Sequence, residues 1–417
     1  MTKDNVINLK RPIESASDVL SSLLRQGAQQ LLTQAIEEEI TLFLSRNNSS
    51  PQPTQAAQVV RNGYLPERNI QTGIGDICVK IPRVRDRSRS GIQFTSNLIP
   101  KYMRRTKNIE ELLPVLYLKG ISTGDFEEAL TSLVGDKAKG MSATTICRLK
   151  QVWQDDYDVW RQRDLSKKRY IYIWVDGIYL QARLESKQCL FVIIGADEFG
   201  NKELLSVTDG FRESEESWTE ALLDLKSRGL KDGANLAVGD GALGFWKALH
   251  KVFPKTKQQR CWVHKTANIL NKLPDTLQEK AKSQLHDIWM NETKAGAMKS
   301  FDLFLEIYAA KYPKATHCLK KDQEELLEFY NFPAEHWIHI RTTNPIESTF
   351  ATVRLRTAKT RGSLSRKTAF TMVFKLLESA SKNWRRLRGQ HRVAEIIQGI
   401  NFVDGIAHQD LQERCAA

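Results

Sequence analysis

The spacing of hydrophobic positions changes several times along the chain, and each change predicts a different kind of element. Residues 15–46 are apolar at helical spacing and run into a polar stretch rich in Pro, Ser and Gln, which predicts a helical region with a linker over 1–58. In 59–107, two runs of alternating Ile and polar residues flank Gly73 and Gly75. This pattern predicts a β-hairpin whose second strand leads into a basic segment.

The pattern over residues 108–165 predicts three helices joined by short turns, as in a helix-turn-helix DNA-binding domain. The third helix has one apolar face, formed by Ile146, Leu149, Trp153, Tyr157 and Trp160. Near its amino end the outward positions are Thr144, Thr145, Arg148 and Gln151, where a recognition helix touches base edges. An ordinary three-helix domain is the alternative, because many helical hairpins share this pattern.

Residues 166–263 alternate β-branched runs with helical runs, which is typical of α/β layering. Three strands rich in aromatic and β-branched residues are followed by a helix, a short apolar strand that ends in Asp240, and another helix. Residues 264–340 give no strand signal and predict an all-helical insertion. A helix over 341–362 would then return to the sheet, and a basic helical region would occupy 363–417.

The returning helix begins in the stretch "RTTNPIESTFATVRLRT", residues 341–357. Pro345 suits the first helical position, so Asn344 is expected as N-cap and Glu347 as the third helical residue, the arrangement of a capping box. The expected buried stripe consists of Ile346, Phe350, Val353 and Thr357. Glu347 and Arg354 share a neighbouring face, about 10 Å apart along the axis. On this segment alone, Glu347 could be only a helix cap.

Charge narrows the choice of partner. The 417 residues include 62 Lys and Arg against 49 Asp and Glu, a net charge of +13, which favours a polyanion such as nucleic acid. Two blocks are one-sided: eight basic residues against Asp86 between Lys80 and Arg105, and twelve against Glu378 between Arg354 and Arg392. A solvated face is the usual explanation of such runs, but we expect these blocks to contact phosphate.

The spacing of the cysteines and the hydropathy of the chain indicate the compartment in which the protein works. The six cysteines are scattered without the dense spacing of a disulfide scaffold, which fits a reducing compartment. No signal peptide opens the sequence, and no apolar run approaches the roughly 18 residues needed to span a bilayer. We therefore expect a protein of the bacterial cytoplasm, associated with the nucleoid and without membrane contact.

Three carboxylates are placed for metal chemistry. Asp176 lies on or at the end of the first predicted strand of the sheet, Asp240 at the carboxyl end of the fourth, and Glu347 on the returning helix. Converging carboxylates repel unless cations hold them, and Mg²⁺ prefers hard oxygen ligands. Two such ions about 3.5–4 Å apart activate the attacking and leaving oxygens of a phosphoryl transfer. The alternative is that both aspartates form Asp-Gly turns.

The stretches "WVDGIYL", "VGDGALGFWKAL", "QRCWVHKTANI" and "RTTNPIESTFATVRLRT", in this order, resemble the transposases of the IS256 family, relatives of the Mutator transposases. The resemblance implies an RNase H-like catalytic domain, a mixed α/β sheet interrupted by the helical insertion, with Asp176, Asp240 and Glu347 as a DDE triad that binds Mg²⁺, or Mn²⁺ as a substitute. It also implies that Arg354, seven residues after the glutamate, meets DNA phosphate. We expect further DNA contacts from the basic residues that follow, Arg356, Lys359 and Arg361.

The family's Cys-x-x-His motif falls on Cys261 and His264. By spacing this pair is half of a zinc site, but no second pair follows at suitable spacing, so a structural zinc is not expected. His264 is expected to hydrogen-bond near the scissile phosphate or a catalytic carboxylate, with a packed core histidine as the alternative. One departure from the family pattern is Ala242, where a histidine is frequent.

The expected function is that of a DNA transposase. It would bind the terminal inverted repeats of its own element and cleave and join strands by hydrolysis followed by transesterification, acting on target DNA as at least a dimer. A copy-out, paste-in route is implied by the resemblance alone. The alternatives are a non-catalytic helix-turn-helix regulator and an RNase H-like nuclease that does not join strands.

Overall fold

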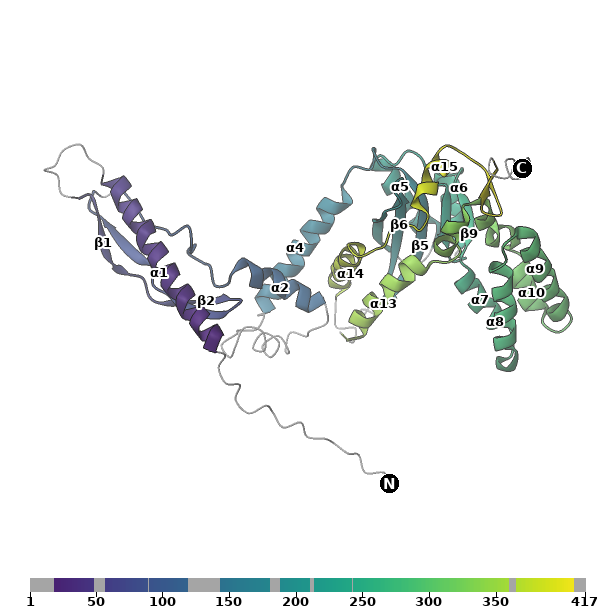
Figure 1. The fold of residues 1–417 in the computed structure, drawn as a ribbon, viewed down its shortest axis with the longest axis horizontal. Coiled ribbons are helices and arrows are strands. Elements are labelled where there is room, and N and C mark those ends of the chain that lie inside the picture. Colours follow the sequence, from purple (N-terminus) through teal and green to yellow (C-terminus); the bar gives the residue numbers. More distant parts are fainter. Residues whose placement is uncertain are drawn as a thin grey trace, which may run out of the picture. The chain divides into compact units, whose positions relative to one another are not determined.

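The computed structural model describes residues 19–48, 57–88, 90–118, 143–180, 188–210, 214–241, 243–359 and 365–408. The chain divides into two compact units, Met1–Cys147 and Arg148–Ala417, and each is considered by itself (Figure 1). No helix within the described ranges is long and apolar enough to cross a membrane.

The first unit packs one long helix against two small antiparallel sheets. Its elements are α1 (Val19–Asn47), β1 (Val59–Tyr64), β2 (Arg68–Thr72), β3 (Gly75–Val79), β4 (Pro82–Asp86) and α2 (Lys107–Leu118). The β2–β3 hairpin confirms the predicted one, and Gly75 in its turn has a φ of 106°, which favours glycine. Ile36 of α1 packs with Ile70 and Ile77 of the hairpin. The pairing of β1 with β4 was not predicted.

Only part of the predicted helix-turn-helix can be compared with the structure. Its first and third helices are α2 and α4 (Ala143–Arg161), and residues 119–142 lie outside the described ranges. Trp153 and Tyr157 are buried, as predicted for the apolar face of α4. However, the ring of Tyr157 packs 4.7 Å from that of Phe370, and its hydroxyl donates to the Val207 carbonyl at 2.9 Å. This half of α4 therefore belongs to the core of the second unit.

A mixed five-stranded sheet organises the second unit, with strand order β7-β6-β5-β8-β9. Its strands are β5 (Tyr170–Leu180), β6 (Gln188–Asp197), β7 (Lys202–Gly210), β8 (Leu236–Gly239) and β9 (Lys257–Arg260). The first three form the predicted antiparallel meander, while β8 runs parallel to β5, and β9 parallel to β8. Sequence reasoning missed β9, because "KQQR" has no apolar residue to mark a strand.

The two faces of the sheet are covered by different helices. On one face, Trp218 of α5 (Glu215–Ser227) and Phe245 of α6 (Leu243–Val252) join a core with Phe191 and Ile173. Side chains alternate along a strand, so Trp174 points to the other face. There its indole N–H donates to the His339 carbonyl at 2.8 Å.

As predicted, residues 264–340 contain helices and no strand, and the structure describes all of them. The segment comprises α7 (Trp262–Leu270), α8 (Asp275–Trp289), α9 (Lys294–Ala309), α10 (Pro313–Lys320), α11 (Gln323–Leu326), η1 (Glu328–Asn331), η2 (Ala334–His336) and α12 (Trp337–Ile340). Figure 1 shows α8, α9 and α10 grouped beside the sheet. The chain continues in α13 (Asn344–Lys359), α14 (Arg366–Ser381), η3 (Gln390–Arg392), α15 (Val393–Ile397), β10 (Phe402–Val403) and β11 (Ile406–Ala407).

Candidate active site

Asp176 and Asp240 come from neighbouring parallel strands. The pairing of β5 with β8 ends at Val175 opposite Gly239, so each aspartate is the next residue on its own chain segment. Each carboxylate accepts the N–H of the glycine that follows it, at 2.8 Å for Asp176 and 2.5 Å for Asp240. Asp176 lies inside the eleven-residue strand β5, so it is not a turn residue. The two aspartates therefore reach the same level of the sheet.

Glu347 reaches the site from α13. The helix begins at Asn344, and the Thr343 carbonyl accepts the N–H of Glu347 at 3.0 Å, so the N-cap is Thr343. The prediction of Asn344 as N-cap is wrong by one residue. The expected capping box, in which the Glu347 carboxylate accepts the Asn344 N–H, is wrong as well, because that N–H donates to the Thr342 hydroxyl at 3.4 Å. The Glu347 carboxylate instead accepts the Thr343 hydroxyl at 2.7 Å.

His264, in the first turn of α7, lies beside the Glu347 carboxylate. Its Nδ1 lies 3.8 Å from Glu347 Oε1. A hydrogen bond with Cys261 raises the pKa of His264 to about 9 against the opposing effect of burial, and the charges of Asp240 and Asp176 contribute in the same direction. Sequence reasoning expected His264 near a catalytic carboxylate or the scissile phosphate, and the structure places it beside Glu347.

Cys261 and His264 lie beside Glu347. The sequence could not reveal this contact, because Glu347 is far from both residues along the chain. Their Sγ and imidazole nitrogen, together with a Glu347 oxygen, all lie within 4.8 Å of one another. Cys261 is fully buried as the N-cap residue of α7, while the His264 and Glu347 side chains are 29% and 28% exposed. The third member of this set comes from a different helix.

Behind Asp240 lies a charge cluster that sequence reasoning missed. Arg260, at the end of β9, has Nη2 3.9 Å from Asp240 Oδ1 and Nη1 2.9 Å from Asp322 Oδ2. Asp322 also forms an ion pair with the ammonium group of Lys265, which is fully buried. A Cβ at Gly241 would lie 1.6 Å from Arg260 Nη2, so a side chain there would displace the guanidinium from its present position. Asp322, from the helical insertion, thus holds the cations beside the site.

We expect Asp322→Asn to destabilise the protein by about 3 kcal/mol, because it leaves the buried Lys265 without its counter-charge and leaves Arg260 with only the more distant Asp240. Thermal or urea unfolding would measure the loss. The control is Asp302→Asn on α9, where the side chain is exposed and the free energy of unfolding should change by less than about 0.5 kcal/mol. Equal stability of the two variants would contradict a structural role of the cluster.

The predicted DNA-contacting residues have different surroundings. Arg148 and Arg354 are exposed, as expected. Arg356 is only 5% exposed, which conflicts with its interpretation as a surface contact to DNA. It follows the buried Thr349 and Val353 by seven and three residues, so it shares their face of α13. The side chains of Thr144, Thr145 and Lys359, and the whole of Arg361, lie outside what the structure describes.

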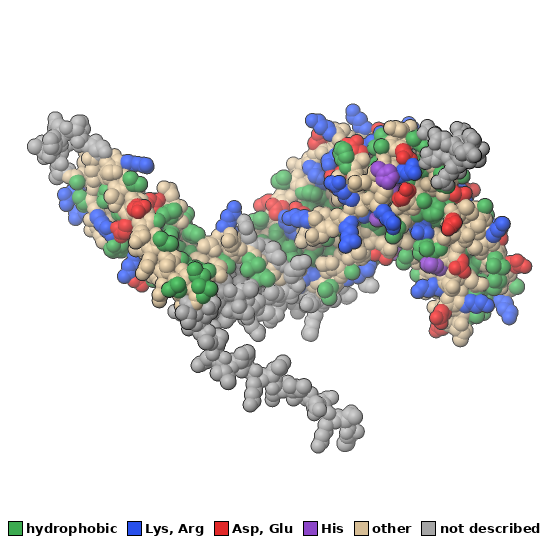
Figure 2. Space-filling view, in the orientation of Figure 1, with side chains coloured by type: hydrophobic (Ala, Val, Ile, Leu, Met, Phe, Trp, Pro, Cys, Tyr) green, Lys and Arg blue, Asp and Glu red, His purple; other side chains and the backbone are tan. Residues whose placement is uncertain are grey.

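Part of the second basic block serves the fold. Arg366 forms two hydrogen bonds with Asp209, at 2.7 and 2.8 Å, and Lys375 pairs with Asp156 at 2.6 Å. Within the described residues, the exposed members of the block are Arg354, Lys367, Lys382, Arg385, Arg386 and Arg388. Figure 2 shows basic and acidic side chains interspersed over the visible face of this unit. The expectation that the whole block contacts phosphate is therefore too broad.

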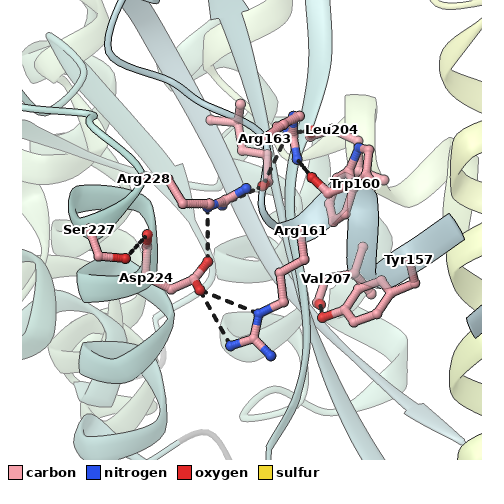
Figure 3. A network of polar contacts seen from close by, with 10 residues as sticks. Tyr157, Trp160, Arg161, Arg163, Leu204, Val207, Asp224, Ser227 and Arg228 are labelled. Carbon is pink, nitrogen blue, oxygen red and sulfur yellow. Dashed lines mark hydrogen bonds and ion pairs between the residues drawn. The ribbon is translucent and has the colours of Figure 1, made fainter. Parts of the chain in front are cut away.

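The carboxyl end of α4 is anchored to the sheet unit by the network in Figure 3. Arg161 donates to Asp224 of α5 at 3.3 Å, and Arg228 approaches the same carboxylate at 3.1 Å. Arg163 lies 4.1 Å from the Trp160 ring and donates to the Leu204 carbonyl at 2.5 Å. The helix that carries Arg148 is therefore firmly joined to the unit that carries the carboxylates.

Together, the fold and the site define a mixed α/β protein with two aspartates at the ends of neighbouring central strand pairings. The chain matches the model of the Mutator family of transposases over residues 1–387, and it belongs to this family. The predicted resemblance to IS256-type transposases is thereby confirmed.

Relatives from several bacteria support the assignment. The chain is 49% identical over 298 residues to the transposase for insertion sequence element IS6120 of Mycolicibacterium smegmatis, covering 71% of this chain and 92% of that protein. It is 50% identical over 281 residues to the transposase for IST2 of Acidithiobacillus ferrooxidans, covering 67% and 95%. Identity to the transposase for IS256 in transposon Tn4001 of Staphylococcus aureus is 29% over 309 residues, covering 73% and 76%.

Proposed function

We propose that this transposase cleaves and joins DNA strands in a metal-dependent reaction, with Asp176, Asp240 and Glu347 as the ligands of the catalytic ions. The observation that carries the proposal is the position of Asp176 and Asp240, which directly follow the paired residues Val175 and Gly239 of two neighbouring parallel strands. Glu347, from a helix far along the chain, lies 3.8 Å from His264, whose pKa the charges of both aspartates help to raise.

The strand order supports an RNase H-like assignment for the sheet unit. Three antiparallel strands followed by two that run parallel to the first, in the order β7-β6-β5-β8-β9, form the arrangement expected for that fold. The helical segment then separates β9 from α13, which carries Glu347. This agrees with the interruption that the family resemblance implies.

The donor set fits Mg²⁺, with Mn²⁺ as a substitute, because carboxylate oxygens are the hard ligands that both ions accept. When bound, such ions activate the attacking oxygen and neutralise the leaving one. The protein's own residues prepare the site: the Thr343 hydroxyl orients Glu347 at 2.7 Å, and the Gly241 N–H orients Asp240 at 2.5 Å. Arg260 offsets part of the negative charge beside Asp240.

Double-stranded DNA is the proposed substrate, both as the terminal inverted repeats of the element and as target. The net charge of +13 favours a polyanionic partner, and Arg354 is exposed two turns beyond Glu347 on α13. The relatives are transposases for insertion sequences, which have two ends. We therefore propose an assembly of at least two copies on DNA, in the bacterial cytoplasm.

A binding and cleavage assay tests the proposal against its alternatives. Purified protein is incubated with labelled duplexes that carry the DNA flanking its gene, with and without Mg²⁺. We expect binding in both conditions, and cleavage and joining only with the ion. Binding without any strand breakage in Mg²⁺ would favour a regulator, and cleavage without joined products would favour a plain nuclease.

We expect Arg148→Ala to weaken binding to the element's ends about tenfold more than binding to random duplex, because base contacts specify sequence whereas phosphate contacts only position the protein. The control is Arg385→Ala, which removes one exposed charge elsewhere and should weaken both complexes alike. Competition binding with the two DNAs measures the ratio. If Arg148→Ala weakened binding to both DNAs equally, Arg148 would contact only the phosphate backbone of the DNA.

A further inference from the structure

Glu347 belongs to two different sets of potential ligands. One is the carboxylate set already described. The other is formed with Cys261 and His264, whose ligand atoms and a Glu347 oxygen all lie within 4.8 Å of one another. A thiolate, an imidazole and a carboxylate suit a borderline-soft ion such as Zn²⁺ better than they suit Mg²⁺.

The local structure holds these three groups in place. Cys261 is the N-cap residue of α7, and His264, three residues later, comes from the first turn of the same helix. The Thr343 hydroxyl lies among all three groups, 3.3 Å from Cys261 Sγ, 3.4 Å from His264 Nδ1 and 2.7 Å from Glu347 Oε1. Such a hydroxyl orients ligands from outside the coordination shell.

We propose that Cys261, His264 and Glu347 form a Zn²⁺ site that competes with the catalytic ions for Glu347. The ion would displace one proton from the Cys261 thiol and one from the protonated His264 imidazole, and would leave a fourth position open to water. Three protein ligands make such a site weaker than a closed structural zinc site, so its occupancy depends on the free Zn²⁺ concentration.

Occupation of the site would inhibit strand transfer, a consequence that rests on the function proposed above. A Glu347 carboxylate drawn toward Cys261 and His264 is withdrawn from the ions held by the aspartates. In addition, a doubly charged ion bound to Glu347 would repel a second cation beside the same carboxylate. Zn²⁺ would therefore act as an inhibitor of the Mg²⁺-dependent reaction.

Binding is tested first, without reference to activity, by titrating the metal-free full-length protein with Co²⁺ as a spectroscopic probe for Zn²⁺. We expect a thiolate-to-cobalt charge-transfer absorption that saturates at one ion per chain and disappears when Zn²⁺ is added. Cys261→Ser should abolish the absorption and His264→Ala should weaken it. The control is Cys318→Ser, which changes another buried free cysteine and should leave the absorption intact. Absorption that persists in Cys261→Ser, or never appears in the parent, overturns the site.

Inhibition is tested second, with each protein compared with its own zinc-free strand transfer in Mg²⁺. We expect Zn²⁺ to lower joining by the parent and by Cys318→Ser at least about tenfold, at a concentration that leaves Cys261→Ser and His264→Ala within about twofold of their own zinc-free values. Equal inhibition of all four proteins overturns the competition for Glu347. A parent that joins no DNA in any condition contradicts the proposed function instead, while the Co²⁺ titration still decides whether the site exists.

Discussion

Asp240→Asn is expected to lower DNA cleavage and joining by about a thousandfold or more, while binding of the element's ends stays within about twofold of the parent. The asparagine keeps an oxygen that can accept the Gly241 N–H, but it brings no negative charge to a divalent ion. Loss of several kcal/mol of charge stabilisation in the transition state corresponds to an effect of this size. Gel assays of cleaved and joined products, beside a binding titration, measure both quantities.

Asp232→Asn is the matched control for that variant. Asp232 also precedes a glycine, lies just before β8 rather than just after it, and is exposed. It should cleave and join DNA like the parent. Retained strand transfer by Asp240→Asn, or an equal loss in Asp232→Asn, would contradict the assignment of Asp240 as a metal ligand.

Glu347→Gln should be as inactive as Asp240→Asn and yet nearly as stable as the parent. The glutamine oxygen can still accept the Thr343 hydroxyl at the start of α13, so the helix should form and the melting temperature should fall by no more than about 2 °C. The charge needed to hold a cation is absent. Thermal unfolding and the joining assay, run on the same preparation, test the two halves of this expectation.

Arg354→Ala, two turns further along α13, should give the opposite phenotype. The exposed guanidinium is expected to contact DNA phosphate, so its loss should weaken DNA binding and reduce the salt dependence of binding by about one phosphate contact. Joining should recover at higher DNA concentration. Two results would contradict this account of α13. One is DNA joining by Glu347→Gln. The other is a melting temperature of Glu347→Gln well below that of the parent, which would mean that Glu347 only stabilises the fold.

The sequence predicted most of the sheet unit, because its strands are strongly apolar and its helices clearly periodic. The exception is β9, which consists of polar residues only. It is a strand because its backbone pairs with the parallel strand β8, not because its side chains are apolar. Arg356 is a charged residue for which the sequence predicted too much exposure. Its charge predicted exposure, but its spacing from Thr349 and Val353 places it on the buried face of α13.

The site was less predictable than the fold because its supporting contacts join residues far apart in the chain. The capping box failed because the Asn344 N–H donates to the Thr342 hydroxyl, and the start of the helix is held instead by the Thr343 N–H, which donates to Cys261, 82 residues earlier. Asp322 gave no signal within its own segment, and its role appears only where it meets Arg260 and Lys265. In both cases a contact between residues far apart in the chain decided the geometry, and the local sequence did not reveal that contact.

The most direct test of the central claim is a strand-transfer assay with duplexes that carry the element's ends, performed in Mg²⁺, in Mn²⁺ and in a chelator, with the parent and with Asp176→Asn. The account predicts joined products with the parent in either ion, none in the chelator, and none with Asp176→Asn at concentrations where it binds the ends as well as the parent does. Joining by the parent in the chelator, or by Asp176→Asn in Mg²⁺, would contradict it.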